Sequence, residues 1–478
     1  MPKFEVLAAV LLMTFGLLVR IVTPPYQLAD EINHFARAWQ ISQGKFLSPT
    51  IEVRAIERGD NPTTRDQIRW SCRGGRVTLK AEDEEFFAAE VPRSLMPSEF
   101  AIDVVNKFHA VNFGMQRKFL ATPLNVDDTE RHLIPNTGSY APPAYFPQAT
   151  ATFVGRLMNW SAGAIYYAMS MSALLFVTAC TFAAMKLLPE KKFLIFVLAS
   201  LPMFLTEAAS SSADAVIYAA CLLGTAWLLS LRRSSEQLST AEIFALMMFA
   251  VTLGLLKQVY GAILLLYWLI PRRRFKSMAQ FVGVGVALIL LELATSLAWL
   301  TFSGDFGRVP LFTGFYMGLE GIDPAAQKNF VLAHPTEFLA ALVSSLMNQA
   351  VWFPKTFFGV LGIVNVYFPK IFYVGLLIAL MVVASFGRLQ LRWTERLIIF
   401  VAVAVTVAGV FGVEYLVWSS VGANIISGVQ GRYFLPIALM ALASLSAVEP
   451  PKFAAAFALA VGIFSAAATV WITFARFY

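Results

Sequence analysis

The stretch FEVLAAVLLMTFGLLVRIV, residues 4–22, decides the class of fold. It is almost unbroken in apolar character and is close to the roughly 20 residues that a helix needs to cross a bilayer. Lys3 precedes it, Arg20 lies near its end, and Pro24-Pro25 follows in place of a small-residue cleavage site. We therefore predict an uncleaved first membrane span, with its N-terminus in the cytoplasm.

The composition extends this interpretation to the whole chain. Apolar residues make up 58% of the 478 residues and charged residues only 14%, whereas a soluble domain has about 25% charged residues. This balance excludes a soluble, disordered, coiled-coil or disulfide-framework protein. The net charge of +7 is typical of Lys and Arg in cytoplasmic loops and does not indicate nucleic acid.

We predict an all-α polytopic membrane protein with about eleven transmembrane helices, within a range of ten to thirteen. The ten spans after the first are 161–188, 191–208, 212–231, 240–256, 258–270, 278–301, 370–387, 395–418, 433–448 and 452–474. With this count the basic clusters between spans all fall on one side, which the positive-inside rule assigns to the cytoplasm. The count requires that 335–352 does not cross, and we predict that this segment lies at the interface or dips partly into the membrane.

Five regions follow from these spans. They are the first transmembrane helix at 1–23, a loop domain on the outer face at 24–160, transmembrane helices 2–7 at 161–301, an outer loop with an interfacial helix at 302–369, and transmembrane helices 8–11 at 370–478 with an outer loop at 419–432. Within the first loop we expect helical pieces near 30–43, 83–90, 98–120 and 143–158. Segment 51–80 has no clear helical period and is predicted to hold short strands or irregular loop.

The first candidate group follows the first span directly. Asp30, His34 and Arg37 are spaced to share one face of a helix, and Glu31 lies beside them. A carboxylate there can act as a general base on a hydroxyl. The alternative is that Asp30 caps a helix and Glu31 favours its first turn.

Two further groups lie near the ends of predicted spans. Tyr140 and Tyr145 belong to a stiff, proline-rich segment, which is typical of an aromatic membrane anchor or of a wall for a sugar or lipid. Asp214 follows Glu207 and the serines 210–212 in a short outer turn. Acids at a membrane edge are candidates for function because an unpaired charge in lipid is costly, although Ser211 or Ser212 could simply cap the next helix.

The last two groups place positive charge on the predicted outer side. Lys257 lies three residues before Tyr260 at an outer turn, and the segment Gln430-Gly431-Arg432-Tyr433 begins a later span. Both cations run against the positive-inside bias, which an anionic partner would explain; the alternatives are snorkelling to lipid headgroups and an interfacial arginine. Arg suits phosphate through its planar fork. We predict one site that holds a membrane-embedded phosphate and activates a hydroxyl.

These motifs resemble a bacterial family of polytopic membrane proteins that is classed as an uncharacterised domain and is related to the GT-C glycosyltransferases. The resemblance covers nearly the whole chain. It rests on Pro25…Asp30-Glu31-x-x-His34-Phe35-x-Arg37, Tyr140…Pro143-x-Tyr145, Ser212-x-Asp214, Lys257-x-x-Tyr260 and Gln430-Gly431-Arg432-Tyr433-x-x-Pro436. It implies a GT-C-like fold with a large, mostly helical first periplasmic loop.

The resemblance also implies a reaction and roles. The enzyme would invert the anomeric centre while moving one sugar from a polyprenyl-phosphate donor to a cell-envelope glycan. Asp30 would be the general base and Glu31 its helper. Arg432 and Lys257 would bind the donor phosphate with Tyr433 and Gln430, and the substrate-binding set would be His34, Arg37, Tyr140, Tyr145, Asp214 and Tyr260.

The expected partners are therefore the lipid-linked donor, the glycan acceptor and membrane lipid, with no nucleic acid. The expected location is the bacterial cytoplasmic membrane, with the active site on its periplasmic face. No cofactor is required, although Asp30, Glu31 and Asp214 could hold one divalent cation. The alternatives are an oligosaccharide ligase or polymerase with a diphosphate-linked donor, and a lipid or glycan transporter; the latter predicts inverted repeats that we do not find.

Overall fold

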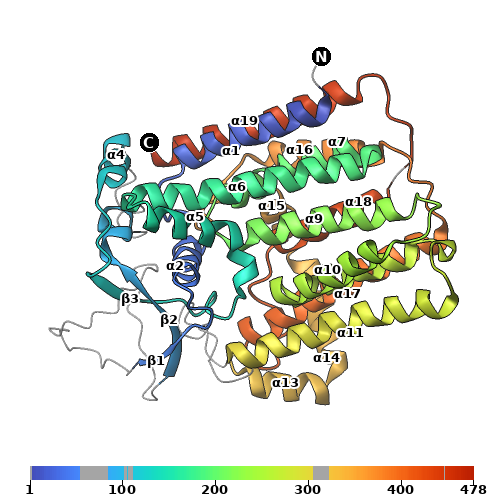
Figure 1. Ribbon diagram of the computed structural model, residues 1–478, viewed down its shortest axis with the longest axis horizontal. Coiled ribbons are helices and arrows are strands. Elements are labelled where there is room, and N and C mark those ends of the chain that lie inside the picture. Colours follow the sequence, from blue (N-terminus) through green and yellow to red (C-terminus); the bar gives the residue numbers. More distant parts are fainter. Residues whose placement is uncertain (1–2, 54–83, 102–104, 106–110, 305–321, 446) are drawn as a thin grey trace.

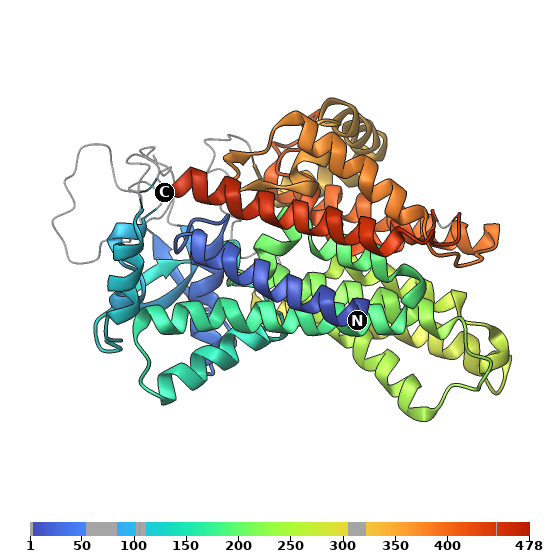
Figure 2. The ribbon, with the colours of Figure 1, turned by 90° about the horizontal axis from the view of Figure 1, so that it is seen from above.

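A bundle of long helices carries a smaller mixed domain at one end (Figure 1). This computed structural model describes residues 3–53, 84–101, 105, 111–304, 322–445 and 447–478. The smaller part, called the loop domain below, consists of the described residues between 24 and 160. Seen from above, α1 (Phe4–Val22) and α19 (Ala454–Phe477) lie side by side over the bundle (Figure 2).

Six helices among the described residues are long and apolar enough to cross a membrane, by length and composition. They are α1, α6 (Ala162–Leu187), α9 (Ala213–Leu231), α11 (Met278–Ser303), α17 (Trp393–Trp418) and α19. The pair α13 (Pro324–Ala333) and α14 (Pro335–Asn348) is bent by 107° and would make a seventh if it were one span. The bend follows from Pro335, which begins the second helix. The predicted first span is thus found at its predicted bounds, while the count of eleven stays a prediction.

The remaining apolar segments form shorter elements. They are α7 (Lys192–Ala199), α8 (Pro202–Ala208), α10 (Thr240–Leu256), the 3₁₀ helix η5 (Gln258–Leu269), α16 (Lys370–Ser385), the 3₁₀ turn η7 (Gly431–Phe434) and α18 (Leu435–Ala443). A continuous helix over 191–208 was therefore wrong. Leu201 is extended and Pro202 begins the next helix, because proline is tolerated in a first turn but not in a helix interior.

The 3₁₀ helix η5 is longer than an α-helix with the same number of residues would be. It has 12 residues in 3₁₀ form, and a 3₁₀ helix rises about 2.0 Å per residue, so it extends roughly 24 Å. An α-helix of the same 12 residues would extend only about 18 Å.

The loop domain contains a three-stranded antiparallel sheet. The sequence analysis expected short strands or irregular loop only within 51–80, and residues 51–53 of that segment lie in the first strand. The strand order is β1-β2-β3, with β1 (Thr50–Val53), β2 (Glu84–Pro92) and β3 (Thr129–Leu133). The predicted helix over 83–90 was wrong, because its described residues form the central strand, paired on both edges. Residues 54–83, which include most of the segment predicted as strand or loop, lie outside the described residues.

Helices of the loop domain pack beside this sheet and the bundle. They are α2 (Glu31–Ser42), α4 (Phe113–Ala121) and α5 (Phe146–Leu157), with 3₁₀ turns η1 (Arg93–Leu95), η2 (Ser98–Phe100) and η3 (Pro142–Tyr145). The expected helix at 30–43 is confirmed as α2, and that at 143–158 as η3 followed by α5. The helix over 98–120 was wrong in extent: the Asn112 side chain caps a new helix by accepting from Met115 N–H at 3.0 Å.

Between α14 and α16 the chain forms α15 (Trp352–Phe358) and a two-stranded hairpin, β4 (Val360–Leu361) and β5 (Val366–Tyr367). This region reaches both halves of the site described below. The Gly362 carbonyl accepts from Ala29 N–H at 3.1 Å, next to Asp30, and α15 packs on η7.

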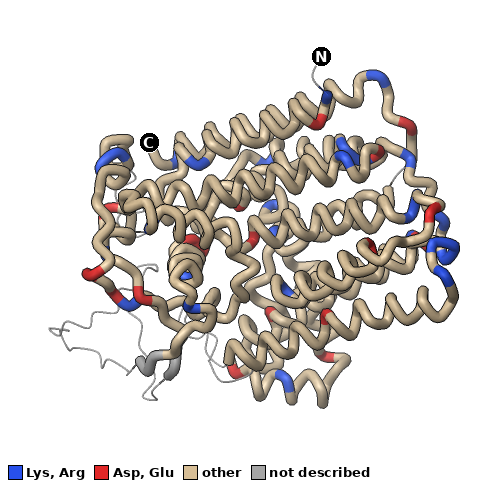
Figure 3. The backbone as a smooth tube through the Cα atoms, viewed as in Figure 1, with Lys and Arg blue, Asp and Glu red and all other residues tan. Residues whose placement is uncertain are grey.

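Basic residues gather at the end of the bundle opposite the loop domain (Figure 3). Several pair with the acids of neighbouring helices there: Arg232 bonds Glu395 at 2.9 Å, and Arg274 bonds Glu242 at 3.2 Å. These ion pairs join neighbouring helices at this end of the bundle.

Candidate functional site

Asp30 occupies a strained position at the start of α2. It is the residue before the first helical one and has a φ of 61°, in the left-handed region that side-chain-bearing residues rarely adopt. Its side chain makes no capping hydrogen bond. The interpretation of Asp30 as a helix cap is therefore wrong, and its carboxylate, with the side chain 40% exposed, is available for other contacts.

The carboxylate of Asp30 faces Arg432, which lies 402 residues later in the chain. Arg432 Nη2 lies 3.3 Å from Asp30 Oδ2, and Arg432 Nη1 lies 3.0 Å from Glu207 Oε1. The Glu207 side chain is almost fully buried, whereas that of Asp30 is partly exposed and so lies at the rim of the site. One guanidinium thus joins a buried acid to an accessible one.

The backbone around Arg432 is held from three sides. Gly431 N–H donates to Thr356 Oγ1 of α15 at 2.7 Å, and the carbonyl of Arg432 accepts from Tyr218 of α9 at 3.2 Å. The Tyr433 carbonyl accepts from Tyr260 of η5 at 3.0 Å. Gly431 is required because a Cβ there would overlap the backbone of α15.

Lys257 reaches the same place from the end of α10. Its Nζ lies 4.9 Å from the centre of the Tyr433 ring, and Arg432 Cζ lies 5.5 Å from that centre. Within the part of the chain that the structure describes, Lys257 forms no ion pair, but it hydrogen-bonds the Tyr140 hydroxyl, and its charge also acts on Tyr260. The Tyr433 ring therefore lies beside two cations, one of which has no ion-pair partner among the described residues.

Asp214 lies among these groups on the first turn of α9. It is 7% exposed, and its charge acts on both Lys257 and Arg432. Its backbone N–H donates to the Ser212 hydroxyl at 3.1 Å. The capping role considered for Ser212 is confirmed, and Ser211 instead donates to the Glu31 carbonyl at 3.2 Å.

His34 is a buried neutral ring beside this site. Its Nδ1 accepts from Ala213 N–H at 3.4 Å and lies 2.7 Å from the Tyr145 hydroxyl, so the proton of the neutral ring lies on Nε2. Burial lowers the pKa of His34 to about 4, against the opposing charges of Asp214 and Asp30. Burial also raises the pKa of Tyr145 well above its ordinary value, so that phenol donates to His34.

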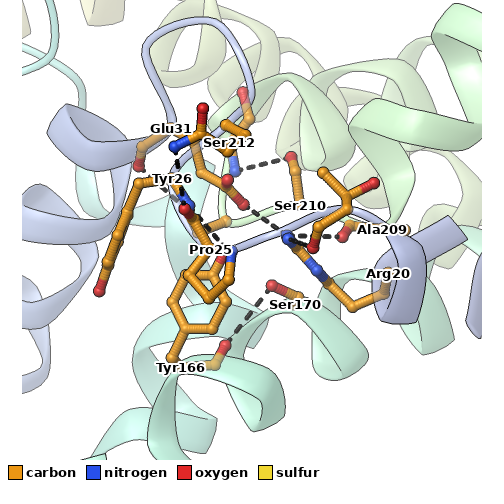
Figure 4. A network of polar contacts seen from close by, with 12 residues as sticks. Arg20, Pro25, Tyr26, Glu31, Tyr166, Ser170, Ala209, Ser210 and Ser212 are labelled. Atoms are coloured by element: carbon orange, nitrogen blue, oxygen red, sulfur yellow. Dashed lines mark hydrogen bonds and ion pairs between the residues drawn. The ribbon is translucent and has the colours of Figure 1, made fainter. Parts of the chain in front are cut away.

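Glu31 is separated from Asp30 although the two are adjacent in sequence. Its Oε1 lies 2.6 Å from Arg20 Nη1, and both side chains are at most 1% exposed. The same guanidinium donates to the Thr23 carbonyl at 2.8 Å and the Pro24 carbonyl at 3.2 Å. Figure 4 shows this ion pair, which joins Arg20 of α1 to Glu31 of α2 next to the 209–212 turn. Glu31 therefore anchors the start of α2.

The Arg37 guanidinium, like that of Arg20, is hydrogen-bonded to groups of the protein. Its guanidinium donates to the Tyr140 carbonyl at 2.8 Å, to the Phe46 carbonyl at 2.7 Å and to Gln40 Oε1 at 2.5 Å. Burial lowers its pKa to about 10, so it stays cationic at neutral pH. Arg37 thereby fixes the segment that carries the Tyr140 ring, which lies 5.7 Å from the His34 ring.

The charged site thus consists of Asp30, Glu207, Asp214, Lys257 and Arg432. It is surrounded by His34 and four tyrosines, Tyr140, Tyr145, Tyr260 and Tyr433. Gln430 directly precedes η7, and its carbonyl accepts from Tyr433 N–H at 3.1 Å. Two acids were missing from the predicted site. Glu207 is named in the sequence analysis without a role. Glu414 of α17, whose charge acts on Lys257 and Arg432, is an acid inside the predicted span 395–418, and that position is the sequence signal that could have identified it.

The divalent-cation arrangement of Asp30, Glu31 and Asp214 is not formed. The Glu31 carboxylate faces Arg20. Among the described residues, no group of three or more His, Cys, Asp or Glu side chains could hold a metal ion.

The buried neutral state of His34 predicts how stability depends on pH. In the unfolded chain its pKa returns to about 6.5, so unfolding takes up a proton between pH 6.5 and about 4. Stability should fall with falling pH there, with a limiting slope of about 1.4 kcal/mol per pH unit. We expect thermal unfolding in detergent to show a shallower fall for His34→Gln than for the wild type. Parallel curves for the two proteins would contradict the buried neutral ring.

The family model described as "Predicted membrane protein (DUF2142)" matches residues 13–441. The chain belongs to the DUF2142 family. It is therefore a multi-pass membrane protein, and the matched region contains every residue of the charged site. No curated protein and no solved structure matches the chain.

Proposed function

We propose that this DUF2142 protein is an inverting membrane glycosyltransferase that moves one sugar from a polyprenyl-phosphate carrier to a hydroxyl of a cell-envelope glycan. The observation that carries the proposal is the Asp30–Arg432 pair beside Lys257, which forms no ion pair with a described residue. It combines a rim carboxylate that caps nothing with two cations that a single ring holds together. This combination suits a reaction in which a base activates a hydroxyl while a phosphate leaves.

The proposed reaction is one displacement. The acceptor oxygen attacks the anomeric carbon, and its proton passes to Asp30. The bond between that carbon and the phosphate oxygen breaks, and the electron pair leaves with the polyprenyl phosphate. Arg432 and Lys257 stabilise this developing negative charge, the type of contribution that is usually largest in catalysis. The anomeric centre is inverted, and no covalent glycosyl-enzyme is formed.

The contacts of Arg432 add an order to these events. The Glu207 side chain in its pair with Arg432 is only 5% exposed, whereas the Asp30 side chain is 40% exposed. A donor phosphate that binds Arg432 would therefore displace Asp30 and leave Glu207 in place. Asp30 would be released toward the acceptor only when a donor is present, which disfavours activation of water at an empty site.

The same proposal includes a GT-C-like arrangement with eleven spans in the bacterial cytoplasmic membrane and the site on the periplasmic face. Two observations support it. The site lies at the end of the bundle that carries the loop domain, and basic residues gather at the other end, where the positive-inside rule expects the cytoplasm (Figure 3). A lipid-linked donor suits a site at a membrane edge because its phosphate lies at the headgroup level.

The test is a transfer assay with purified protein, isolated envelope glycans and a panel of radiolabelled undecaprenyl-phosphate sugars. We expect label to reach a glycan with the wild type. Arg432→Ala should slow transfer at least about 100-fold, the loss typical of one oxyanion-stabilising donor. Absence of transfer from every monophosphate donor would refute the proposal, and transfer from a diphosphate-linked oligosaccharide would favour the ligase alternative.

A further inference from the structure

Two polar atoms at the charged site are buried without a hydrogen-bond partner. They are Arg432 Nε, on a residue that is only 6% exposed, and Glu414 Oε2. Buried polar groups in folded proteins are nearly always hydrogen-bonded, so each orphan needs an explanation. Here one orphan is a donor and the other an acceptor, and both belong to residues whose charges act on each other.

Glu414 is placed by the end of α17 and by the loop that follows. The Ser419 hydroxyl donates to the Glu414 carbonyl at 3.4 Å. Gly428 lies against the carboxylate: a Cβ there would come within 2.6 Å of Glu414 Oε2, and the φ of Gly428 is 84°. The glycine thus leaves room for the carboxylate, whose charge acts on the Tyr433 ring and on Lys257.

The acidic side chains of the site outnumber its cationic side chains among the described residues. Four acids, Asp30, Glu207, Asp214 and Glu414, face two cations, Lys257 and Arg432. Arg432 is already shared by two of the acids, and Glu414 forms no ion pair with a described residue. A ligand that were only an anion would leave the surplus carboxylate uncompensated, whereas a ligand that also donates hydrogen bonds would satisfy it.

We infer that Glu414 is a substrate-binding residue that accepts a hydrogen bond from a hydroxyl or amino group of the transferred sugar. Arg432 Nε and Lys257 Nζ hold the adjoining phosphate. The inference rests on the proposed function and deepens it, since it adds recognition of the sugar to recognition of the phosphate. The site is then matched to a glycosyl phosphate, an anion and a set of donors joined by one bond.

The experiment compares binding of two kinds of lipid to purified protein. One is undecaprenyl phosphate without sugar; the other is the same lipid carrying glucose, arabinose or an amino sugar. Glu414→Met should bind undecaprenyl phosphate at least as tightly as the wild type, because it removes a negative charge near the phosphate. It should bind the best glycosylated lipid about tenfold or more weakly, the loss expected for one hydrogen bond to a charged group.

A second variant identifies the donor group. Glu414→Gln keeps an acceptor oxygen but no charge, so it should recover most of the affinity for a hydroxyl sugar and little for an ammonium sugar. Glu337→Met, which removes an exposed acid of α14, is the matched control and should change neither affinity. Thermal unfolding shows whether each variant is folded.

The outcomes separate this inference from the proposed function. Equal changes for the bare and the glycosylated lipid, or no change for either, would overturn the role of Glu414. Selective loss of the glycosylated lipid without any transfer in the assay above would support Glu414 as a sugar-binding residue and refute the proposed reaction. If the wild type bound none of these lipids, the donor class and the inference would both fall.

Discussion

Asp30→Asn should abolish glycosyl transfer while leaving the fold intact. An amide cannot take the proton of an acceptor hydroxyl, and a general base contributes about 10²–10⁴-fold to rate. The fold should survive because the side chain is 40% exposed and makes no capping bond. Arg432 also keeps its shorter contact with Glu207. The measurement is initial transfer rate with the donor that the wild type uses.

The matched control is Asp127→Asn, the same chemical change at an exposed position of the loop domain. It should transfer at the wild-type rate. Retained turnover in Asp30→Asn would rule out Asp30 as the base and direct attention to Asp214, a buried acid whose charge acts on both cations. Loss of turnover together with a lowered unfolding temperature would instead assign Asp30 a structural role.

Among the variants described here, Arg20→Met should lower the free energy of unfolding the most. It removes the cation that neutralises Glu31, and both side chains are at most 1% exposed. Breaking a buried pair by removing one partner costs about 3–5 kcal/mol, because the remaining charge is left uncompensated. The carbonyls of Thr23 and Pro24 would also lose the hydrogen bond from Arg20, although the Pro24 carbonyl would still accept from Gln27 N–H. The measurement is the unfolding midpoint in detergent.

The double variant Arg20→Met/Glu31→Leu is the diagnostic control. Replacing a whole buried pair by apolar residues is often neutral, so the double variant should be more stable than Arg20→Met alone. Lys118→Met breaks an exposed pair with Glu99, 76% and 41% exposed, and should cost less than about 1 kcal/mol. A loss in Arg20→Met no larger than in Lys118→Met would contradict a dependence of α2 on this pair.

The candidate site shows how far local sequence reasoning extends. The motifs that contain Asp30, Asp214, Lys257 and Arg432 were found one by one, because an acid or a cation at the wrong end of an apolar run is visible in a window of a few residues. Their convergence was only a hypothesis. The structure brings them together because the residues all lie at the ends of elements that face the loop domain.

Glu31 shows the opposite case. Its neighbour Asp30 has a left-handed backbone, and successive residues on a helix point about 100° apart. The two carboxylates therefore diverge, one toward Arg432 and the other toward Arg20. Helical spacing separates the two side chains, but it cannot say which partner each one meets, because Arg20 and Arg432 lie on other elements.

By itself, the sequence determined the membrane class, the first helix over Phe4–Val22 and the helix after Asp30. These depend on apolar length and on contacts between residues three or four apart. Only the tertiary structure decided that Glu84–Pro92 is a strand, that Arg432 joins Asp30 to Glu207, and that Glu414 belongs to the site. A strand needs its partners and a buried charge needs its counter-ion, and both are supplied by segments far away in the chain.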